Sequence, residues 1–145
     1  MSDTRNAYRI SNHTRPPVPP FNSNSSFADE LLWNQILTEQ LLINATLQDY
    51  AYDSATTDSE LAHGTMGRSP NLIANYSIRN SAKPPSVRQQ IFEYINAKNT
   101  KTIDFDQTLY VIRVGINNYN LNKSLTPLQT VKSIIKCLNF LVQDS

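Results

Sequence analysis

The chain has 145 residues, of which 39% are hydrophobic and 17% are charged, and its formal net charge is +1. A chain of this length can build one modest hydrophobic core but not two comfortable ones. The small net charge argues against a protein that coats nucleic acid or an acidic membrane by bulk electrostatics. With Cys137 as its single cysteine the chain cannot form an internal disulfide, so we expect an intracellular protein rather than a disulfide-stapled secreted one.

Hydropathy along the chain gives no sign of targeting to a membrane. No segment has about 18 consecutive apolar residues, and no apolar stretch of signal-peptide length follows the N-terminal arginines. We therefore expect neither export nor a membrane span. The Asn, Ser and Thr-rich regions are similar in composition to those of many fungal nuclear proteins, which favours the nucleus over the cytoplasm.

Residues 1–26 are predicted to form a disordered tail. The stretch "RISNHTRPPVPPFNSNSS" contains four prolines, many small polar residues and few side chains to bury. The prolines favour an extended polyproline II conformation and have the P-x-x-P spacing that aromatic grooves recognise. Because no basic residue stands at the flanking position that usually sets the direction of such binding, a proline-rich spacer is the preferred interpretation.

Residues 27–52 are predicted to contain one long helix, over about 27–50, with the sequence "FADELLWNQILTEQLLINATLQDY". At about 100° per residue its apolar side chains divide between two opposite sides, so the helix is apolar nearly all round. A helix of this kind has to be covered from two directions in a soluble protein. The region 27–62 also contains seven acidic residues and no Lys or Arg, which suits a basic or a neutral apolar partner surface.

Two arrangements would cover both sides of this bifacial helix. Both sides could be buried in one four-helix core, or one side could pack on the C-terminal helices while the other binds a partner protein or a second copy of the chain. As a pattern, the segment resembles the acidic segments of transcription activators, and its Leu spacing is similar to that of a nuclear export signal. The predicted partner-binding residues are its large anchors: Phe27, Leu31, Trp33, Leu37 and Leu41.

Residues 53–85 are predicted to be a flexible linker, because they contain two of the chain's three glycines, three prolines and many small polar residues. Gly64 and Gly67 are too closely spaced for a phosphate-binding loop, so a turn is the preferred interpretation there. Ser69 follows Arg68 and precedes a proline, which makes it the candidate phosphorylation site of the chain.

Residues 86–145 are predicted to form a small helical domain, and its helix starts are marked locally. Ser86 and Thr126 are each followed three positions later by Gln, and Asp104 has the same relation to Gln107. Each such pair can satisfy free backbone N–H groups at the start of a helix. The sequence therefore predicts a three-helix C-terminal unit over about 86–143, and a mostly α-helical protein.

The three expected helices span about 87–98, 105–118 and 127–143, and each carries one apolar stripe that we interpret as its packing side. The middle segment is rich in β-branched residues and contains Gly115, so a strand stays an alternative there. A core made from these stripes alone is marginal at this size, and further apolar surface is expected to cover it. The stripe of the last helix consists of Leu128, Val131, Ile135, Leu138 and Val142.

Catalysis finds little support in the sequence. His13 and His63 lie in segments predicted to be loose, whereas a general base has to be held close to the proton that it removes. Cys137 is expected to be a small buried side chain rather than a nucleophile. Asp104 and Asp106 are explained by a helix start. We therefore expect no enzyme, no cofactor and no metal site.

The expected function is that of a non-catalytic helical subunit or regulatory adaptor of an intracellular multiprotein complex. It would bind one or more protein subunits, or a second copy of itself, through the acidic apolar helix. The alternative is a small helix-turn-helix-like DNA-binding or transcription-regulatory protein with an acidic activation-like segment. Lys123, Lys132 and Lys136 would then contact phosphates, although the last helix offers only two cations and no arginine.

Overall fold

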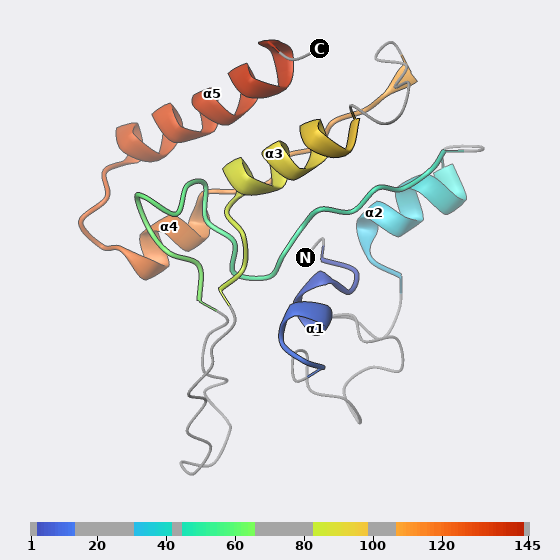
Figure 1. Ribbon diagram of the computed structural model, residues 1–145, viewed down its shortest axis with the longest axis horizontal. Helices are drawn as coiled ribbons and strands as arrows, with labels where there is room; N and C mark the ends of the chain where they lie inside the picture. The colour runs from blue at the N-terminus through green and yellow to red at the C-terminus, as the bar shows by residue number, and fades with distance from the viewer. Residues whose placement is uncertain (1–2, 14–30, 42–44, 66–82, 99–106, 144–145) are drawn as a thin grey trace. The chain divides into compact units, whose positions relative to one another are not determined.

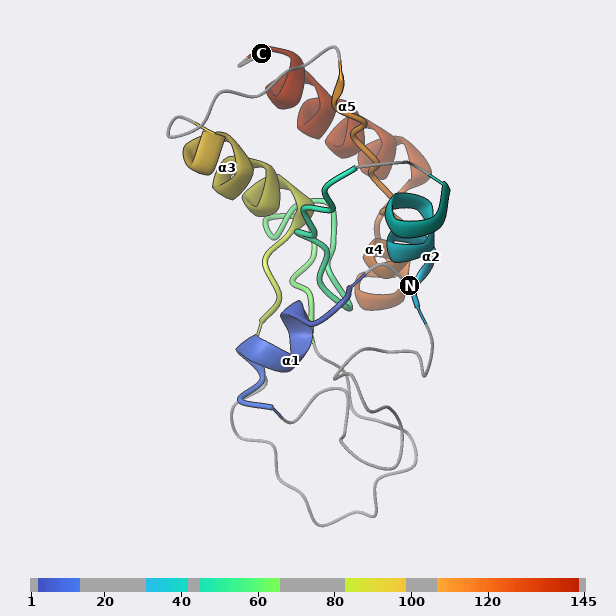
Figure 2. The same ribbon diagram turned by 90° about the vertical axis from the view of Figure 1, so that its right-hand side faces the viewer.

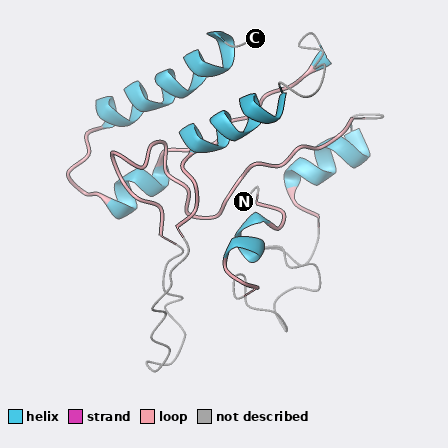
Figure 3. Cartoon of the chain, in the orientation of Figure 1, coloured by secondary structure: helices cyan, strands magenta, loops and turns pink. Residues whose placement is uncertain are grey.

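In a computed structural model of the chain, the residues described are 3–13, 31–41, 45–65, 83–98 and 107–143. All regular secondary structure in these ranges is helical, which confirms the predicted mostly α-helical fold for this part of the chain (Figure 3). The chain divides into two compact units. The first comprises residues 1–54 with 65–84, and the second comprises residues 55–64 with 85–145.

The first unit begins with a short helix, α1 (Asn6–Ile10), which the carboxylate of Asp3 caps (Figure 1). Asp3 Oδ1 accepts a hydrogen bond from the backbone N–H of Asn6 at 2.7 Å, and Oδ2 accepts one from Ala7 at 3.0 Å. Acceptors at this place satisfy the N–H groups that a helix start leaves without partners. Residues 3–13 therefore contain a capped helix, whereas the sequence predicted a disordered tail over 1–26. Residues 14–26 lie outside the described ranges.

The helix predicted over 27–50 is much shorter in the structure. Within the described residues it consists of α2 (Trp33–Ile36), which continues directly into the π-helical turn η1 (Leu37–Leu41), and residues 27–30 and 42–44 lie outside them. Residues 45–50 are not helical. The side-chain amide of Asn6 donates hydrogen bonds to the backbone carbonyls of Asp49 and Ala51, each at 2.9 Å. These tertiary hydrogen bonds tie residues 49–51 to α1, so contacts with a distant segment outweigh local helix propensity here.

In the second unit, α3 (Val87–Lys98) and α5 (Pro127–Gln143) run beside each other (Figures 1 and 2). Both helices have the bounds predicted from the sequence. The rings of Phe92 on α3 and Phe140 on α5 meet with their centroids 5.0 Å apart. Ser86 caps α3 as expected, because its N–H donates to Gln89 Oε1 at 2.8 Å and its Oγ accepts from the Gln89 N–H at 3.4 Å.

The middle helix predicted over 105–118 is replaced by α4 (Ile116–Leu121) and, before it, by residues 108–114, which are neither helix nor strand. Gly115 stands at the N-cap of α4 with φ +121°, a conformation that no helix interior contains. A helix therefore cannot pass through this residue, and only glycine adopts such a φ without strain. Residues 105 and 106 of the predicted helix lie outside the described ranges.

Residues 55–64 are part of the core of the second unit. The sequence predicted a flexible linker over 53–85, and this prediction is wrong for residues 55–64. Ala55, Thr56 and Thr57 are buried. The carbonyls of Thr56 and Thr57 accept hydrogen bonds from the backbone N–H groups of Val87 and Arg88, at 2.8 and 3.2 Å. Buried backbone groups need such partners, and here the first turn of α3 provides them. Residues 55–64 therefore accept the hydrogen bonds of the first N–H groups of α3, and the same bonds fix this segment against the helix.

Candidate functional site

Helix α5 begins with a capping box that fixes where the helix starts. The N–H of Thr126 donates to Gln129 Oε1 at 2.8 Å, and the N–H of Gln129 donates back to Thr126 Oγ1 at 3.3 Å. Pro127 takes the first helical position, where its missing N–H costs nothing. The helix then continues for 17 residues, a length of about 25 Å at 1.5 Å per residue.

The side of α5 that packs on its own unit is made largely of small side chains. Thr130, Ser133 and Cys137 are buried. The thiol of Cys137 lies 3.7 Å from the carbonyl oxygen of Thr57, to which it can donate a weak hydrogen bond. Small residues let the helix approach segment 55–64 closely. The packing side of α5 is therefore formed by small residues such as Thr130 and Ser133, whereas the sequence predicted large aliphatic residues there.

The aliphatic stripe of α5 faces outward, which corrects the expectation that it packs into the core. These side chains are 45% to 74% exposed, whereas aliphatic side chains in a core are normally covered. Their spacings along the helix are three, four, three and four residues, the repeat with which two helices pack side by side. The stripe, referred to below as the α5 stripe, consists of Leu128, Val131, Ile135, Leu138 and Val142.

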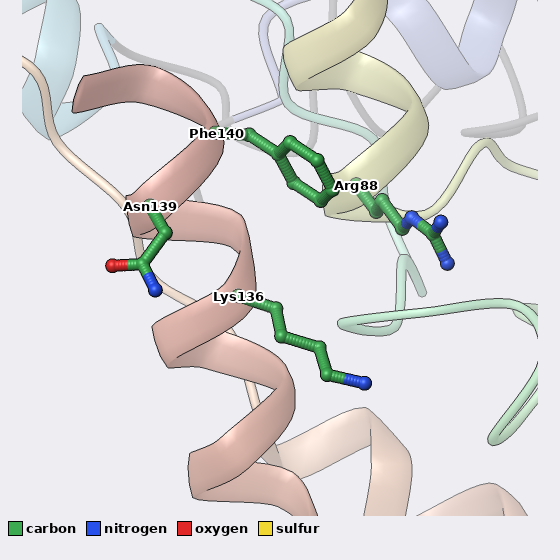
Figure 4. A pocket seen from close by; sticks show the side chains of 4 residues that line it. All are labelled: Arg88, Lys136, Asn139 and Phe140. Carbon is green, nitrogen blue, oxygen red and sulfur yellow. The ribbon is translucent and has the colours of Figure 1, made fainter. Parts of the chain in front are cut away.

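A shallow hollow of about 330 Å³ lies on the flank of α5 that faces α3 (Figure 4). It is lined by Arg88, Lys136, Asn139 and Phe140. The guanidinium carbon of Arg88 lies 5.7 Å from the centre of the Phe140 ring, in the range of a cation–π contact. Arg88 forms ion pairs with two carboxylates. Lys136, the other cation of the hollow, has no carboxylate partner among the described residues.

Arg88 is held by two acidic residues of segment 55–64. Its Nη1 lies 3.0 Å from Asp58 Oδ2 and 3.6 Å from Glu60 Oε1. The hydrogen bond and the charge of Asp58 raise the pKa of Arg88 above its already high ordinary value, so the guanidinium stays charged. Because the Arg88 side chain is one-third exposed, this ion pair positions α3 against the segment more than it stabilises the fold.

The candidate catalytic groups are not assembled into a site in the described ranges. Burial raises the pKa of the Cys137 thiol, and the Asp58 carboxylate raises it further, so little reactive thiolate forms. His13 stacks on Tyr8, with ring centroids 4.6 Å apart, and His63 is exposed. No group of three His, Cys, Asp or Glu side chains in these ranges could hold a metal ion. Asp104 and Asp106 lie outside them.

The partner-binding residues predicted on the acidic segment are only partly placed by the structure. Leu31 and Trp33 are exposed, and Leu37 is half-buried. Phe27 lies outside the described residues, and the side chain of Leu41 is not described. The predicted phosphorylation site and the predicted phosphate contacts have different outcomes. Ser69 lies outside the described residues, whereas the three candidate phosphate contacts are all exposed: Lys123, Lys132 and Lys136.

Sequence reasoning missed a group of structural asparagines on α4 and just after it. Asn117 donates to the carbonyl of Ala55 at 2.9 Å, and Asn122 donates to that of Leu61 at 3.0 Å. Between them Asn118 is buried and bonds to Thr57. The only signal in the sequence is the density of Asn in "INNYNLN", which is equally typical of a solvent-exposed loop.

In comparisons with protein families, with curated proteins and with solved structures, nothing matches this chain. Among the described helices none is long and apolar enough to cross a membrane. The candidate functional site of the second unit is therefore defined by its own geometry: the α5 stripe, its lysine-bearing flank and the hollow beside it.

Proposed function

We propose that the protein is a non-catalytic helical subunit or adaptor that binds a partner protein through the α5 stripe. The single observation that carries this proposal is the outward position of five aliphatic side chains on one helix. Contiguous exposed apolar surface on a folded unit is the usual mark of a protein interaction site. Its continuous run along α5 suits an elongated partner element rather than a small molecule.

The apolar contact available at this surface supplies part of the free energy that specific binding needs. Covering the exposed half of a large aliphatic side chain contributes about 1 kcal/mol. The five side chains of the α5 stripe would together contribute on the order of 5 kcal/mol, before the entropy lost on association is subtracted. Contacts from the flanks of the helix would add to this. Ile135, at the centre of the stripe, is the residue that we expect to matter most, because central and fully covered positions dominate binding energy.

The acidic segment of the first unit remains part of the proposal as a second contact. Leu31 and Trp33 are its exposed anchors, and an aromatic residue beside a leucine is a common centre of a protein interface. We propose that partner binding uses the α5 stripe as the principal surface and these two side chains as an additional one. We propose an intracellular complex, in the nucleus rather than the cytoplasm, on the composition of the Asn, Ser and Thr-rich regions.

DNA binding is less well supported than protein binding. Lys123, Lys132 and Lys136 are exposed, but one exposed side of α5 carries five aliphatic rather than basic residues. A helix that enters a DNA groove needs polar and basic side chains on that side. We therefore place the lysines on the flank of a protein interface.

The test is affinity purification of the tagged full-length protein from its native cells, comparing the parent with a Ile135→Gln/Leu138→Gln variant. Glutamine keeps helix propensity and removes the apolar contact. We expect a partner recovered in fixed ratio with the parent to be lost from the variant, while far-ultraviolet circular dichroism shows an unchanged helix content.

The matched control is Leu109→Gln/Val111→Gln, which removes two exposed aliphatic side chains from residues 108–114. This variant should keep the partner. Equal loss with both variants would assign the binding to general stickiness rather than to α5, and full retention by the Ile135→Gln/Leu138→Gln variant would refute the proposed surface. A Trp33→Ala variant measures the contribution of the acidic segment in the same assay.

A further inference from the structure

Helix α5 presents three different sides, and their order around the helix defines what can lie against it. At about 100° per residue, one side contains the buried residues Thr130, Ser133 and Cys137, and the next contains the α5 stripe. The third side contains Lys132, Lys136 and Asn139, all exposed. A partner lying along the stripe therefore has Lys132 and Asn139 directly on one flank, with Lys136 further round the helix on the same side.

The charge on this flank is one-sided. Helix α5 contains two lysines and no acidic residue over its whole length. Among the described residues neither Lys132 nor Lys136 takes part in an ion pair. The cations lie one turn apart on the same side of the helix, and the hollow beside Lys136 leaves room next to its ammonium group (Figure 4).

Resting on the proposed function, we infer that the partner element is an acidic amphipathic helix. Its apolar residues would repeat with the three-and-four spacing of the α5 stripe, and Asp or Glu side chains on its edge would face Lys132 and Lys136. The apolar stripe provides the contact area, and the lysines select the sign of the charge next to it. A partner helix of four to five turns matches the length of about 25 Å that α5 offers.

Two other occupants fit the same surface less well. A second copy of the chain, pairing α5 with α5, would bring the lysines of both helices to one interface without any acidic residue on either helix. An anionic membrane would attract the lysines, but the stripe is narrow and has no aromatic residue, whereas interfacial helices usually have a broad apolar side with aromatic anchors. Charge complementarity therefore argues against α5 pairing with α5 and favours an acidic helix as the occupant.

The experiment uses full-length protein and three synthetic 21-residue helical peptides as probes. All three have the same Leu and Ile seam, and their flanking positions carry only Glu, only Gln or only Lys. Fluorescence anisotropy at low ionic strength should give the Glu peptide at least tenfold tighter binding than the Gln peptide, and weaker binding still for the Lys peptide. Because exposed charges are screened by salt, the differences should shrink at high ionic strength.

The matching protein variant is Lys132→Glu/Lys136→Glu, which reverses the flank and leaves the stripe intact. It should prefer the Lys peptide, whereas the Ile135→Gln/Leu138→Gln variant should bind all three peptides at least fivefold more weakly. These two results separate the claims. Equal or tighter binding of the Gln or Lys peptide by the parent would overturn the acidic partner while leaving the proposed function standing.

Two further measurements decide against the other occupants. Sedimentation of the parent protein with phosphatidylserine vesicles would overturn the inference in favour of a membrane. A dimer of the parent at micromolar concentration that Ile135→Gln/Leu138→Gln dissociates would overturn it in favour of a second copy. Absence of binding to every peptide, together with unchanged partner recovery by the stripe variant in native cells, would instead refute the proposed function itself.

Discussion

Asn118 holds Thr57 with both ends of its side-chain amide. Its Oδ1 accepts a hydrogen bond from the Thr57 N–H at 3.0 Å, and its Nδ2 donates to Thr57 Oγ1 at 2.7 Å. Both side chains are fully buried, and the two residues are 61 positions apart in the sequence. The pair therefore closes a long loop through polar contacts where most small domains would use aliphatic ones.

Replacing this amide should destabilise the second unit. Asn118→Ala leaves the buried N–H and hydroxyl of Thr57 without partners, and such groups cost about 1–3 kcal/mol each. We expect a loss of about 2 kcal/mol or more in the free energy of unfolding, measured by urea titration of the circular dichroism at 222 nm. The matched control is Asn120→Ala, an exposed position on the same helix, which should change stability by less than about 0.5 kcal/mol. Equal effects of the two substitutions would contradict the role assigned to Asn118.

Replacing Thr130 should stabilise the protein, because its buried Oγ1 has no hydrogen-bond partner among the described residues. Valine has the same shape and removes the unsatisfied hydroxyl, so Thr130→Val should raise the free energy of unfolding by about 1 kcal/mol. Thr126→Val provides a control of opposite sign, since it removes the capping hydroxyl of α5 and should cost about 1 kcal/mol. A destabilised Thr130→Val protein would show that the hydroxyl is satisfied in solution.

Gly115→Ala should destabilise the protein through the backbone rather than through crowding. An added Cβ would lie 3.5 Å from Thr130 Cγ2 and 3.9 Å from Ile134 Cδ1, which are ordinary contact distances. The φ of +121° is the obstacle, and it should cost about 1–2 kcal/mol for an L-residue. Adding Thr130→Ser, which removes the nearest methyl group, should therefore not restore the melting temperature lost by Gly115→Ala. Restoration would mean that steric contact is the cause.

Cys137 should react slowly with thiol reagents while the protein is folded. The raised pKa of its thiol lowers the thiolate fraction at pH 8, and burial blocks the reagent's approach. With an aromatic disulfide reagent we expect a rate at least a hundredfold below that in denaturing urea. Modification at the unfolded rate under native conditions would contradict the buried position of this side chain.

Asp3 should make the first unit less stable as pH rises. Burial raises the pKa of this carboxyl above its ordinary value of 3.8, even though backbone hydrogen bonds from Asp53, Ala7 and Asn6 act in the opposite direction. Between the ordinary and the raised pKa the folded state binds more protons than the unfolded one, so this contribution to stability falls with increasing pH and is greatest in acid.

The test follows unfolding through the fluorescence of Trp33, the only tryptophan of the chain and a residue of the first unit. Asp3→Asn keeps a capping oxygen but cannot ionise. The parent should therefore gain stability relative to this variant as pH is lowered from 7 to 4. A relative loss over the same interval would refute the direction given for the Asp3 pKa.

Local signals predicted α3 and α5 well, because capping is a short-range interaction. The Ser86 and Thr126 boxes join residues three positions apart, so the starts of α3 and α5 can be derived without knowing the rest of the fold. The prediction for 105–118 was wrong because Gly115 breaks the helix, and the sequence shows the glycine but not the sign of its φ.

The candidate site could be predicted only in part. Periodicity identifies Leu128, Ile135 and Leu138 as sharing one side of α5, but it does not say whether that side faces a core or a partner. This choice depends on Thr130 and Cys137 being buried, and Cys137 packs against Thr57 of a distant segment. The hydrogen bond between Asn118 and Thr57, 61 positions apart, is equally nonlocal. Such pairings need the folded chain, and no spacing within a window of the sequence contains them.

The outward α5 stripe has a consequence for calorimetry. Exposure of apolar surface produces most of the heat-capacity increase on unfolding, and aliphatic surface that is already exposed in the folded protein adds nothing to it. The isolated protein should therefore unfold with a heat-capacity increment below the usual value for its size, and partner binding should supply the missing part as a negative increment. Its melting temperature would then rise with partner concentration, so that folding and assembly become one linked equilibrium.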